Sequence, residues 1–178
     1  GYIDIDGFHE HTEARVELPS NPKYMTSYFL NPPPADLTDS FTVIKESLLK
    51  AFSYEITLPF LCHTFWSVIA NFVPDAKPNC LWVVGLTGSY KTTYAALMSS
   101  FFGDFTARDL ETWRSTKNAI EKNGYYLKDA LFVVDDYKGV DISMKDIVSC
   151  IQSYGDQHGR SRMKGDGTNQ KTWFIRAN

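Results

Sequence analysis

The sequence predicts an α/β fold in which a mostly parallel sheet is covered by helices. Two short apolar runs, Cys80–Val84 and Ala130–Val134, have the continuous hydrophobicity of strands buried on both faces. Helical patterns follow at Thr92–Phe102, at Ser115–Lys122, which Gly124 is expected to stop, and at Ser143–Tyr154. Strands that alternate with helices form parallel sheets, because each helix carries the chain back across the sheet.

A small accessory segment, residues 1–77, is expected before this core. Short strands are predicted at Tyr2–Asp6, Arg15–Leu18 and Tyr24–Leu30, separated by proline and asparagine turns. The triple proline at 32–34 precedes Asp36, which is expected to start a helix. The predicted apolar face of that helix comprises Leu37, Phe41, Ile44, Leu48 and Phe52.

The apolar stretch Ile56–Val73 is long enough to be considered as a membrane span. Polar residues and a proline interrupt it, so a buried helix is predicted instead, with no membrane association. The residues expected to face the core recur at helical spacing: Leu61, Phe65, Val68, Ile69 and Phe72.

The core is expected over residues 78–178, after a polar break at Asp75–Asn79. Further strands are predicted at Phe105–Leu110 and Trp173–Ile175. Because the chain stops within this last strand-like run, the core is expected to be incomplete at its C-terminal end.

Composition is that of a globular domain, with 43% hydrophobic residues and a formal net charge of -3. A generic electrostatic nucleic-acid binder is excluded by this balance, so any nucleic-acid surface must be local. Cys62, Cys80 and Cys150 form no C-x-x-C pair and are predicted to be reduced, buried thiols rather than disulfides or zinc ligands. No secretory signal is visible, which favours the cytoplasm.

The most informative motif is the run GLTGSYKT over Gly85–Thr92, a near match to the phosphate-loop (Walker A) pattern G-x-x-x-x-G-K-[ST]. It follows a predicted buried strand and precedes a predicted helix, which is the context that a phosphate loop requires. We therefore predict a P-loop NTPase core that binds ATP and Mg²⁺. The expected nucleotide-binding residues are Gly85, Leu86, Thr87, Gly88, Ser89, Tyr90, Lys91, Thr92 and Thr93.

Individual roles follow from this pattern. Lys91 is expected to reach the β- and γ-phosphates, and the Thr92 hydroxyl to bind Mg²⁺. Tyr90 replaces the second glycine of the pattern; we expect near-helical dihedral angles there, with the side chain directed away from the phosphates. The alternative is a chance glycine turn between a strand and a helix.

The second motif is the pair Asp135 and Asp136, which ends the apolar run Ala130–Val134. In a P-loop enzyme such a strand ends beside the phosphate loop. Asp135 is predicted to hold the metal, and Asp136 to act as the general base toward water. Alternatively, the two residues only start the turn that follows.

A basic segment follows, with five basic residues against two acidic ones between Asp156 and Asn178. Arg160 and Arg162 are candidates for an arginine that acts on the nucleotide of a neighbouring subunit, or for contacts to a DNA backbone. A solvated loop is the equal alternative.

Four runs in order, GLTGSYKTTYAALMSSFFGDF, TWRSTKNAIE, KDALFVVDDYKG and HGRSRMKGDGT, resemble the ATPase domain of primase-helicase proteins of phages, plasmids and genomic islands. That family is related to AAA+ and superfamily-three helicases. The resemblance implies a homo-oligomeric ring, ATP hydrolysis at subunit interfaces and translocation on single-stranded or forked DNA. It also implies a functional block between the two motifs, comprising Trp113, Ser115, Thr116, Asn118 and Glu121.

The expected function is therefore the ATP-hydrolysing domain of a DNA helicase or translocase in mobile-element replication. The resemblance implies a polar sensor residue after a further strand; Asn178 is a candidate, and weak or absent turnover is expected of these 178 residues alone. A nucleotide-dependent assembly switch without motor activity is the alternative. A small P-loop kinase is disfavoured, because no acceptor-binding motif is visible.

Overall fold

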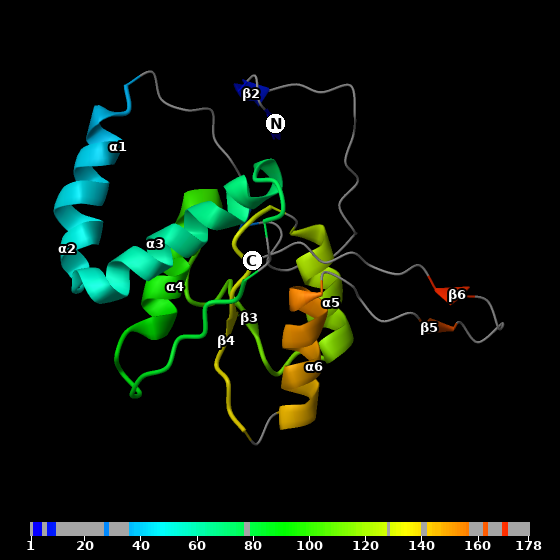
Figure 1. The fold of residues 1–178 in the computed structure, drawn as a ribbon. Coiled ribbons are helices and arrows are strands. Elements are labelled where there is room, and N and C mark those ends of the chain that lie inside the picture. Colours follow the sequence, from blue (N-terminus) through cyan, green and yellow to red (C-terminus); the bar gives the residue numbers. More distant parts are fainter. Residues whose placement is uncertain are drawn as a thin grey trace.

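The computed structural model describes residues 2–4, 7–9, 27–28, 36–76, 79–127, 129–139, 142–156, 162–163 and 169–170. Helices dominate this part of the chain (Figure 1). They are α1 (Thr38–Val43), a π-helical turn (Ile44–Leu48), α2 (Leu49–Ala51), α3 (Tyr54–Ile69), α4 (Lys91–Ser99), α5 (Lys117–Tyr126) and α6 (Met144–Gly155). Short 3₁₀ turns, Ala70–Phe72 and Ser100–Phe102, extend α3 and α4.

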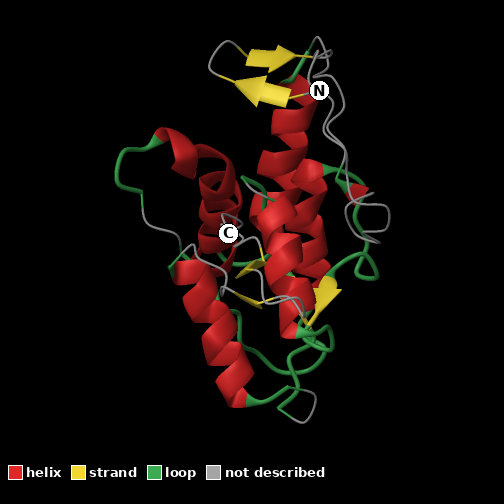
Figure 2. Cartoon of the chain, turned by 90° about the vertical axis from the view of Figure 1, so that its right-hand side faces the viewer, coloured by secondary structure: helices red, strands yellow, loops and turns green. Residues whose placement is uncertain are grey.

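The strands are short and form three separate pairs. Figure 2 shows them as short arrows beside the much longer helices. Two pairs are antiparallel: β1 (Tyr2–Asp4) with β2 (Gly7–His9), and β5 (Arg162–Met163) with β6 (Asn169–Gln170). The third pair, β3 (Glu111–Thr112) with β4 (Val134–Asp135), is parallel and lies between α4 and the α5–α6 pair in Figure 1. Among the described residues, this ladder is all that represents the predicted parallel sheet.

The prediction of a buried strand at Cys80–Val84 is wrong for the described structure. The segment is irregular and leaves Trp82, Val83 and Val84 exposed, with Val84 at 82%. An apolar run indicates a preference for burial but names no pairing partner, and a strand forms only where a neighbouring backbone pairs with it.

Of the other predicted core strands, Phe105–Leu110 is displaced and Ala130–Val134 is shorter than predicted. Residues 107–110 are turns and pairing begins only at Glu111, so the strand expected at Phe105–Leu110 is displaced toward the C-terminus. In the run Ala130–Val134 only Val134 is paired, together with Asp135. Trp173–Ile175 and Arg15–Leu18 lie outside the described residues. Of Tyr24–Leu30, the structure describes only Ser27 and Tyr28, which forms an isolated bridge with Gly103.

Two of the three predicted core helices are confirmed closely. The helix α4 and its 3₁₀ turn cover Thr92–Phe102. The helix α6 starts after Ser143, whose hydroxyl accepts a hydrogen bond from the backbone N–H of Asp146 at 3.2 Å, as an N-cap does. The helical pattern predicts that Ile147, Val148 and Ile151 face inward, but Val148 and Ile151 are exposed. The buried residues of α6 are Ile147, Ser149, Cys150 and Ser153.

The helix α5 continues through Gly124, where it was expected to stop. Thr116 caps its start, since the Thr116 hydroxyl accepts from the backbone N–H of Ala119 at 3.3 Å. Gly124 serves packing instead, because a Cβ there would lie 2.2 Å from the Tyr154 hydroxyl oxygen on α6. The glycine is thus needed for the close approach of α5 and α6.

The predicted core faces of the N-terminal helices need correction. Asp36 does start a helix, because its carboxylate accepts from the backbone N–H of Thr38 at 2.8 Å. Leu37 and Phe41 are nevertheless exposed, and Leu48 is the buried residue of that face. On α3 the buried stripe is Thr57, Leu61, Thr64 and Ser67, whereas Phe65, Ile69 and Phe72 are exposed.

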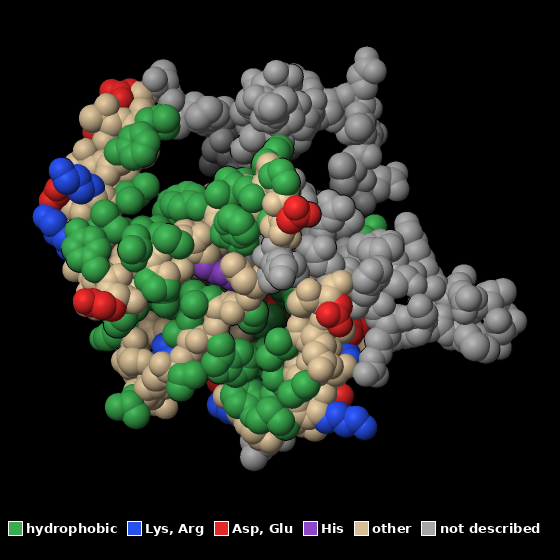
Figure 3. Space-filling view, in the orientation of Figure 1, with side chains coloured by type: hydrophobic (Ala, Val, Ile, Leu, Met, Phe, Trp, Pro, Cys, Tyr) green, Lys and Arg blue, Asp and Glu red, His purple; other side chains and the backbone are tan. Residues whose placement is uncertain are grey.

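Small polar residues can lie on the buried face of α3 because two of their hydroxyl groups donate hydrogen bonds to backbone carbonyl oxygens of the same helix. Thr64 donates to the carbonyl oxygen of Phe60 at 2.7 Å, and Ser67 to that of Thr64 at 2.6 Å. The exposed apolar side chains of this region contribute to the hydrophobic surface in Figure 3. No helix among the described residues is both long and apolar enough to span a bilayer.

Two apolar clusters hold the described residues together. The first joins α3 and α4 through Leu61, Tyr94 and Met98, and the second joins α5 and α6 through Ile120, Ile147 and Cys150. All three cysteines are free, but only Cys150 is buried, so the prediction of buried thiols is wrong for Cys62 and Cys80.

Candidate functional site

The loop Gly85–Tyr90 leads directly into α4, as the motif predicts. Gly88 has φ 81°, a left-handed conformation that favours glycine. Tyr90 also has a left-handed backbone conformation, with φ 59° and ψ 19°, so the expectation of near-helical, right-handed angles is wrong. This conformation gives a physical reason for the glycine that the general pattern places here. The Tyr90 side chain is exposed and tolerated at the cost of backbone strain.

Lys91 closes the loop through its own side chain. Its Nζ donates to the carbonyl oxygens of Gly85 at 2.8 Å and Leu86 at 2.7 Å, and to the hydroxyl oxygen of Ser89 at 3.2 Å. The ammonium group therefore lies within the loop, where backbone oxygens surround it. A phosphate bound here would compete with neutral carbonyls for this cation, and the attraction between two opposite charges is stronger than that between a charge and a neutral carbonyl dipole.

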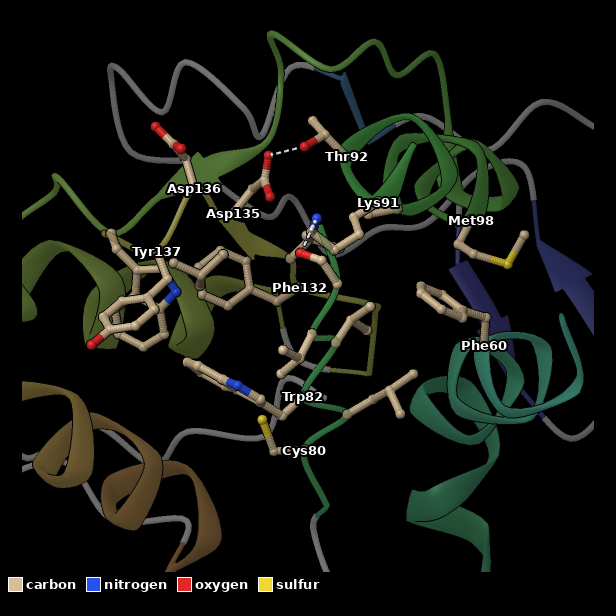
Figure 4. A pocket seen from close by; sticks show the side chains of 18 of the residues that line it. Phe60, Cys80, Trp82, Lys91, Thr92, Met98, Phe132, Asp135, Asp136 and Tyr137 are labelled. Atoms are coloured by element: carbon tan, nitrogen blue, oxygen red, sulfur yellow. Dashed lines mark hydrogen bonds between the residues drawn. The ribbon is translucent and has the colours of Figure 1, made fainter. Parts of the chain in front are cut away.

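Thr92 and Asp135 meet across the end of β4. The Thr92 hydroxyl donates to Asp135 Oδ2 at 2.7 Å (Figure 4), although the two residues are 43 positions apart in the sequence. The parallel pairing of β4 with β3 places Asp135 at the C-terminal edge of the ladder, beside the start of α4. The two residues predicted to share a metal are thus brought together.

Asp136 points away from Asp135 and from Thr92 in Figure 4. It has φ 56°, a left-handed angle that aspartate tolerates better than most residues. Its Oδ2 accepts a hydrogen bond from Lys138 Nζ at 3.0 Å and lies 3.8 Å from Arg114 Nη2. Two cations therefore face the predicted base, and neither was predicted as part of the site.

A cavity of about 860 Å³ extends from the loop toward the interior. Its walls include residues 79–85 and residues 131–138, with side chains of α3 and α6 at the sides. Trp82 is central to one wall, with its ring centroid 5.8 Å from that of Tyr137 and 6.1 Å from that of Trp113. The cavity is polar at the loop and apolar below it, as the labelled side chains in Figure 4 illustrate.

Burial raises the pKa of Tyr154, which lines this cavity, and three further titratable groups along it also have shifted pKa values. Burial lowers the pKa of His63, although a hydrogen bond with Asn79 opposes that shift. Desolvation raises the pKa of the Cys80 thiol, even though the residue as a whole is exposed. Burial, together with the nearby Glu121 carboxylate, raises the pKa of the Cys150 thiol to about 11. All three shifts favour the neutral form at neutral pH.

Of the remaining residues predicted to bind the nucleotide, Thr87, Ser89 and Thr93 line the cavity, and Leu86 is not among its lining residues. Leu86, Thr87, Ser89 and Thr93 are exposed, and the Ser89 hydroxyl donates to the Leu86 carbonyl oxygen at 2.7 Å. Arg160 and Asn178 lie outside the described residues. Arg162 begins β5, and its side chain is not among those described.

The block implied by the resemblance is largely structural in the described fold. Trp113 is buried, the Ser115 hydroxyl donates to Glu111 Oε1 at 2.6 Å, and Glu121 is ion-paired with Lys117 at 3.6 Å. Thr116 caps α5, and Asn118 is exposed. Arg114, which lies between Trp113 and Ser115 but was not predicted as part of the block, is 3.8 Å from the Asp136 carboxylate.

Within the described ranges, no three His, Cys, Asp or Glu side chains gather as a metal-binding cluster. The Thr92 hydroxyl and the Asp135 carboxylate nevertheless form a pair of hard oxygen donors, which is the ligand type that Mg²⁺ prefers.

These features define a candidate phosphate-binding site: a glycine-containing loop before a helix, with a lysine, a hydroxyl and a carboxylate at its mouth. Residues 42–173, a range that contains the whole of this candidate site, match the family described as Domain of unknown function (DUF927). The chain belongs to this family. No curated protein and no solved structure matches it.

Proposed function

We propose that this chain is an ATP-binding and ATP-hydrolysing domain with a P-loop core. The observation that carries the proposal is the contact of Thr92 with Asp135, 2.7 Å between the hydroxyl oxygen and Oδ2; Thr92 follows Lys91, whose ammonium group lies within the phosphate loop. Residues of a phosphate loop and of a strand end that are distant in sequence meet as the phosphoryl-transfer template requires. A chance glycine turn would not bring these groups together.

The proposed roles follow from the chemistry of each side chain. Lys91 would exchange the carbonyl oxygens of Gly85 and Leu86 for phosphate oxygens, and the N-terminus of α4 would add its favourable dipole. Thr92 and Asp135 would hold Mg²⁺, which when bound supplies positive charge against the phosphate oxygens. Asp136 would orient the attacking water and accept its proton.

We further propose that hydrolysis drives a DNA helicase or translocase in the replication of mobile elements, in the cytoplasm and as a homo-oligomeric ring. Support comes from the family, which is found in primase-helicase-like proteins of phages and plasmids. The local excess of basic residues after Asp156 would supply DNA-backbone contacts, with Arg160 or Arg162 reaching a neighbouring nucleotide. An assembly switch that binds ATP without motor work is the second candidate.

The test is ATP hydrolysis by the purified longer protein that contains these 178 residues, with and without single-stranded DNA, because weak or absent turnover is expected of the 178 residues alone. We expect stimulation by DNA, and a loss of about a hundredfold or more in Asp136→Asn, because a general base contributes at least that factor. Asp39→Asn, an exposed aspartate on α1, is the matched control and should leave the rate unchanged. ATP binding with no effect of DNA on hydrolysis would favour the switch, and no ATP binding would refute both.

A further inference from the structure

We propose that the aromatic part of the cavity holds the purine base of the nucleotide, with the base stacked on the Trp82 ring. The inference rests on the proposed function, since it requires the phosphates to lie at the loop, and it adds a binding residue that the sequence motifs do not include. It is carried by the position of Trp82 in the cavity wall and by the exposure of its ring.

One cavity connects the phosphate loop to the aromatic side chains. Its wall contains Gly88 and Lys91 at the loop and, further in, Trp82, Phe132 and Tyr137. The cavity volume of about 860 Å³ lies within the range of roughly 300–1,000 Å³ that is typical of sites for small molecules and cofactors. A cavity of this size has room for a whole nucleotide and not only for its phosphates.

Charge is confined to one end of this cavity. Among the described residues, the Lys, Arg, Asp and Glu side chains that line it are Lys91, Asp135, Asp136 and Lys138, all at the start of α4 or at and just after the end of β4. Further in, the Thr64 and Tyr154 hydroxyls already donate to backbone carbonyl oxygens. An uncharged, flat ring therefore fits the inner part better than a charged group does, because burying an unpaired charge is costly.

The Trp82 ring is available for stacking. It is 46% exposed, although it forms part of the cavity wall. The Tyr137 ring meets it at 61° and the Trp113 ring at 53°, so neither stacks on it face to face. Figure 4 shows Trp82 and Tyr137 next to one another, below Lys91. A purine on the indole would cover exposed apolar surface in the offset arrangement that aromatic rings favour.

The position of Trp82 in the sequence limits how far the base must reach. Trp82 precedes Gly85 by three residues, so their Cα atoms are at most about 11 Å apart, because an extended chain advances about 3.3–3.6 Å per residue. The ribose and the phosphates of a nucleotide span a gap of this size. One short segment of the chain can therefore hold both the base and the phosphates.

The consequence is that Trp82 acts on the base and not on the phosphates. Calorimetric titration of Mg·ATP and of Mg·triphosphate, the inorganic anion without base or sugar, into wild type and Trp82→Leu tests this. We expect Trp82→Leu to bind Mg·ATP about fivefold or more weakly, because leucine offers no aromatic face. Its affinity for Mg·triphosphate should change less than about twofold, which also shows that the variant is folded.

Phe65→Leu is the matched control, because Phe65 is also 46% exposed and also contacts a second ring, that of Phe101, but is not among the residues that line the cavity. It should leave both affinities unchanged, and Trp82→Phe should retain most of the affinity for Mg·ATP. Equal losses for both ligands in Trp82→Leu, or no loss of Mg·ATP affinity beyond that of Phe65→Leu, would overturn the inference while leaving the proposed function intact. A wild-type protein that binds neither ligand would overturn both.

Discussion

At the scale of single residues, two of the four described non-glycine residues with left-handed backbone angles lie at the site. Tyr90 and Asp136 adopt left-handed angles on either side of the contact between Thr92 and Asp135. Strained residues of this kind concentrate at binding and catalytic sites, where the surrounding structure holds them. Aspartate tolerates the conformation through its short polar side chain, whereas a tyrosine gains nothing comparable. Tyr90 is therefore the position at which strain should be measurable.

We expect Tyr90→Gly to raise the free energy of unfolding by up to about 1 kcal/mol. Relief of the left-handed strain, about 1–2 kcal/mol, exceeds the entropic cost of a glycine, about 0.5–1 kcal/mol. The lost side chain contributes little because it is 68% exposed. Urea denaturation measures the change.

Tyr54→Gly is the control, because Tyr54 is 67% exposed but lies in α3, where glycine only weakens the helix. It should destabilise the protein. If the two variants lose stability equally, Tyr90 is not strained.

At the scale of elements, the packing of α5 against α6 depends on a glycine. The Tyr154 hydroxyl donates to the carbonyl oxygen of Ile120 at 2.9 Å, and its ring stacks on Phe132 with centroids 6.1 Å apart. Both contacts place the Tyr154 ring end over Gly124, where a Cβ would come within 2.2 Å of the hydroxyl oxygen. Tyr154 also connects the helices to the segment that leads into β4 and Asp135.

Gly124→Ala should therefore lower the free energy of unfolding by about 1–2 kcal/mol, although alanine favours helices over glycine by about 1 kcal/mol. Gly155→Ala, on α6, is the matched control, because a Cβ there meets no atom within 4 Å. It should be neutral or stabilising by up to about 1 kcal/mol. Thermal unfolding of the two variants gives the comparison, and a stabilised Gly124→Ala would contradict the close approach.

Local signals predicted helices better than they predicted strands. Ser143 and Thr116 were inside the predicted ranges and proved to be N-caps, because capping depends on residues within one turn. Whether Cys80–Val84 forms a strand could not be predicted from its own residues, because strand pairing depends on a backbone segment distant in the sequence. For the same reason Gly124 was read as a helix stop, whereas its role depends on Tyr154, thirty residues further along the chain.

The candidate site shows the same division. The phosphate-loop pattern predicted that Lys91, Thr92 and Asp135 belong together, and the contact between Thr92 and Asp135 confirms that these two residues meet. The cations beside Asp136 were not predictable, because Arg114 reaches it only through the pairing of β3 with β4. The left-handed backbone conformation of Tyr90 could be seen only in the structure, because a tyrosine replaces the glycine of the pattern at that position.

At the scale of the whole molecule, the helices and the short parallel ladder surround one cavity. The α3–α4 and α5–α6 clusters hold opposite sides of the cavity, and the loop and the end of β4 form its polar mouth. We propose that this mouth binds the phosphates of ATP. The proposals of ATP hydrolysis and of DNA translocation both depend on that binding.

Calorimetric titration of Mg·ATP into wild type, Lys91→Ala and Lys145→Ala tests the claim most directly. Lys145 is an exposed lysine on α6 and controls for the loss of one charge. We expect wild type and Lys145→Ala to bind with affinities within about twofold of each other. Lys91→Ala should bind at least about tenfold more weakly, because it loses a hydrogen-bonded cation that is worth about 1.5–3 kcal/mol. Equal binding by Lys91→Ala and wild type would contradict the account.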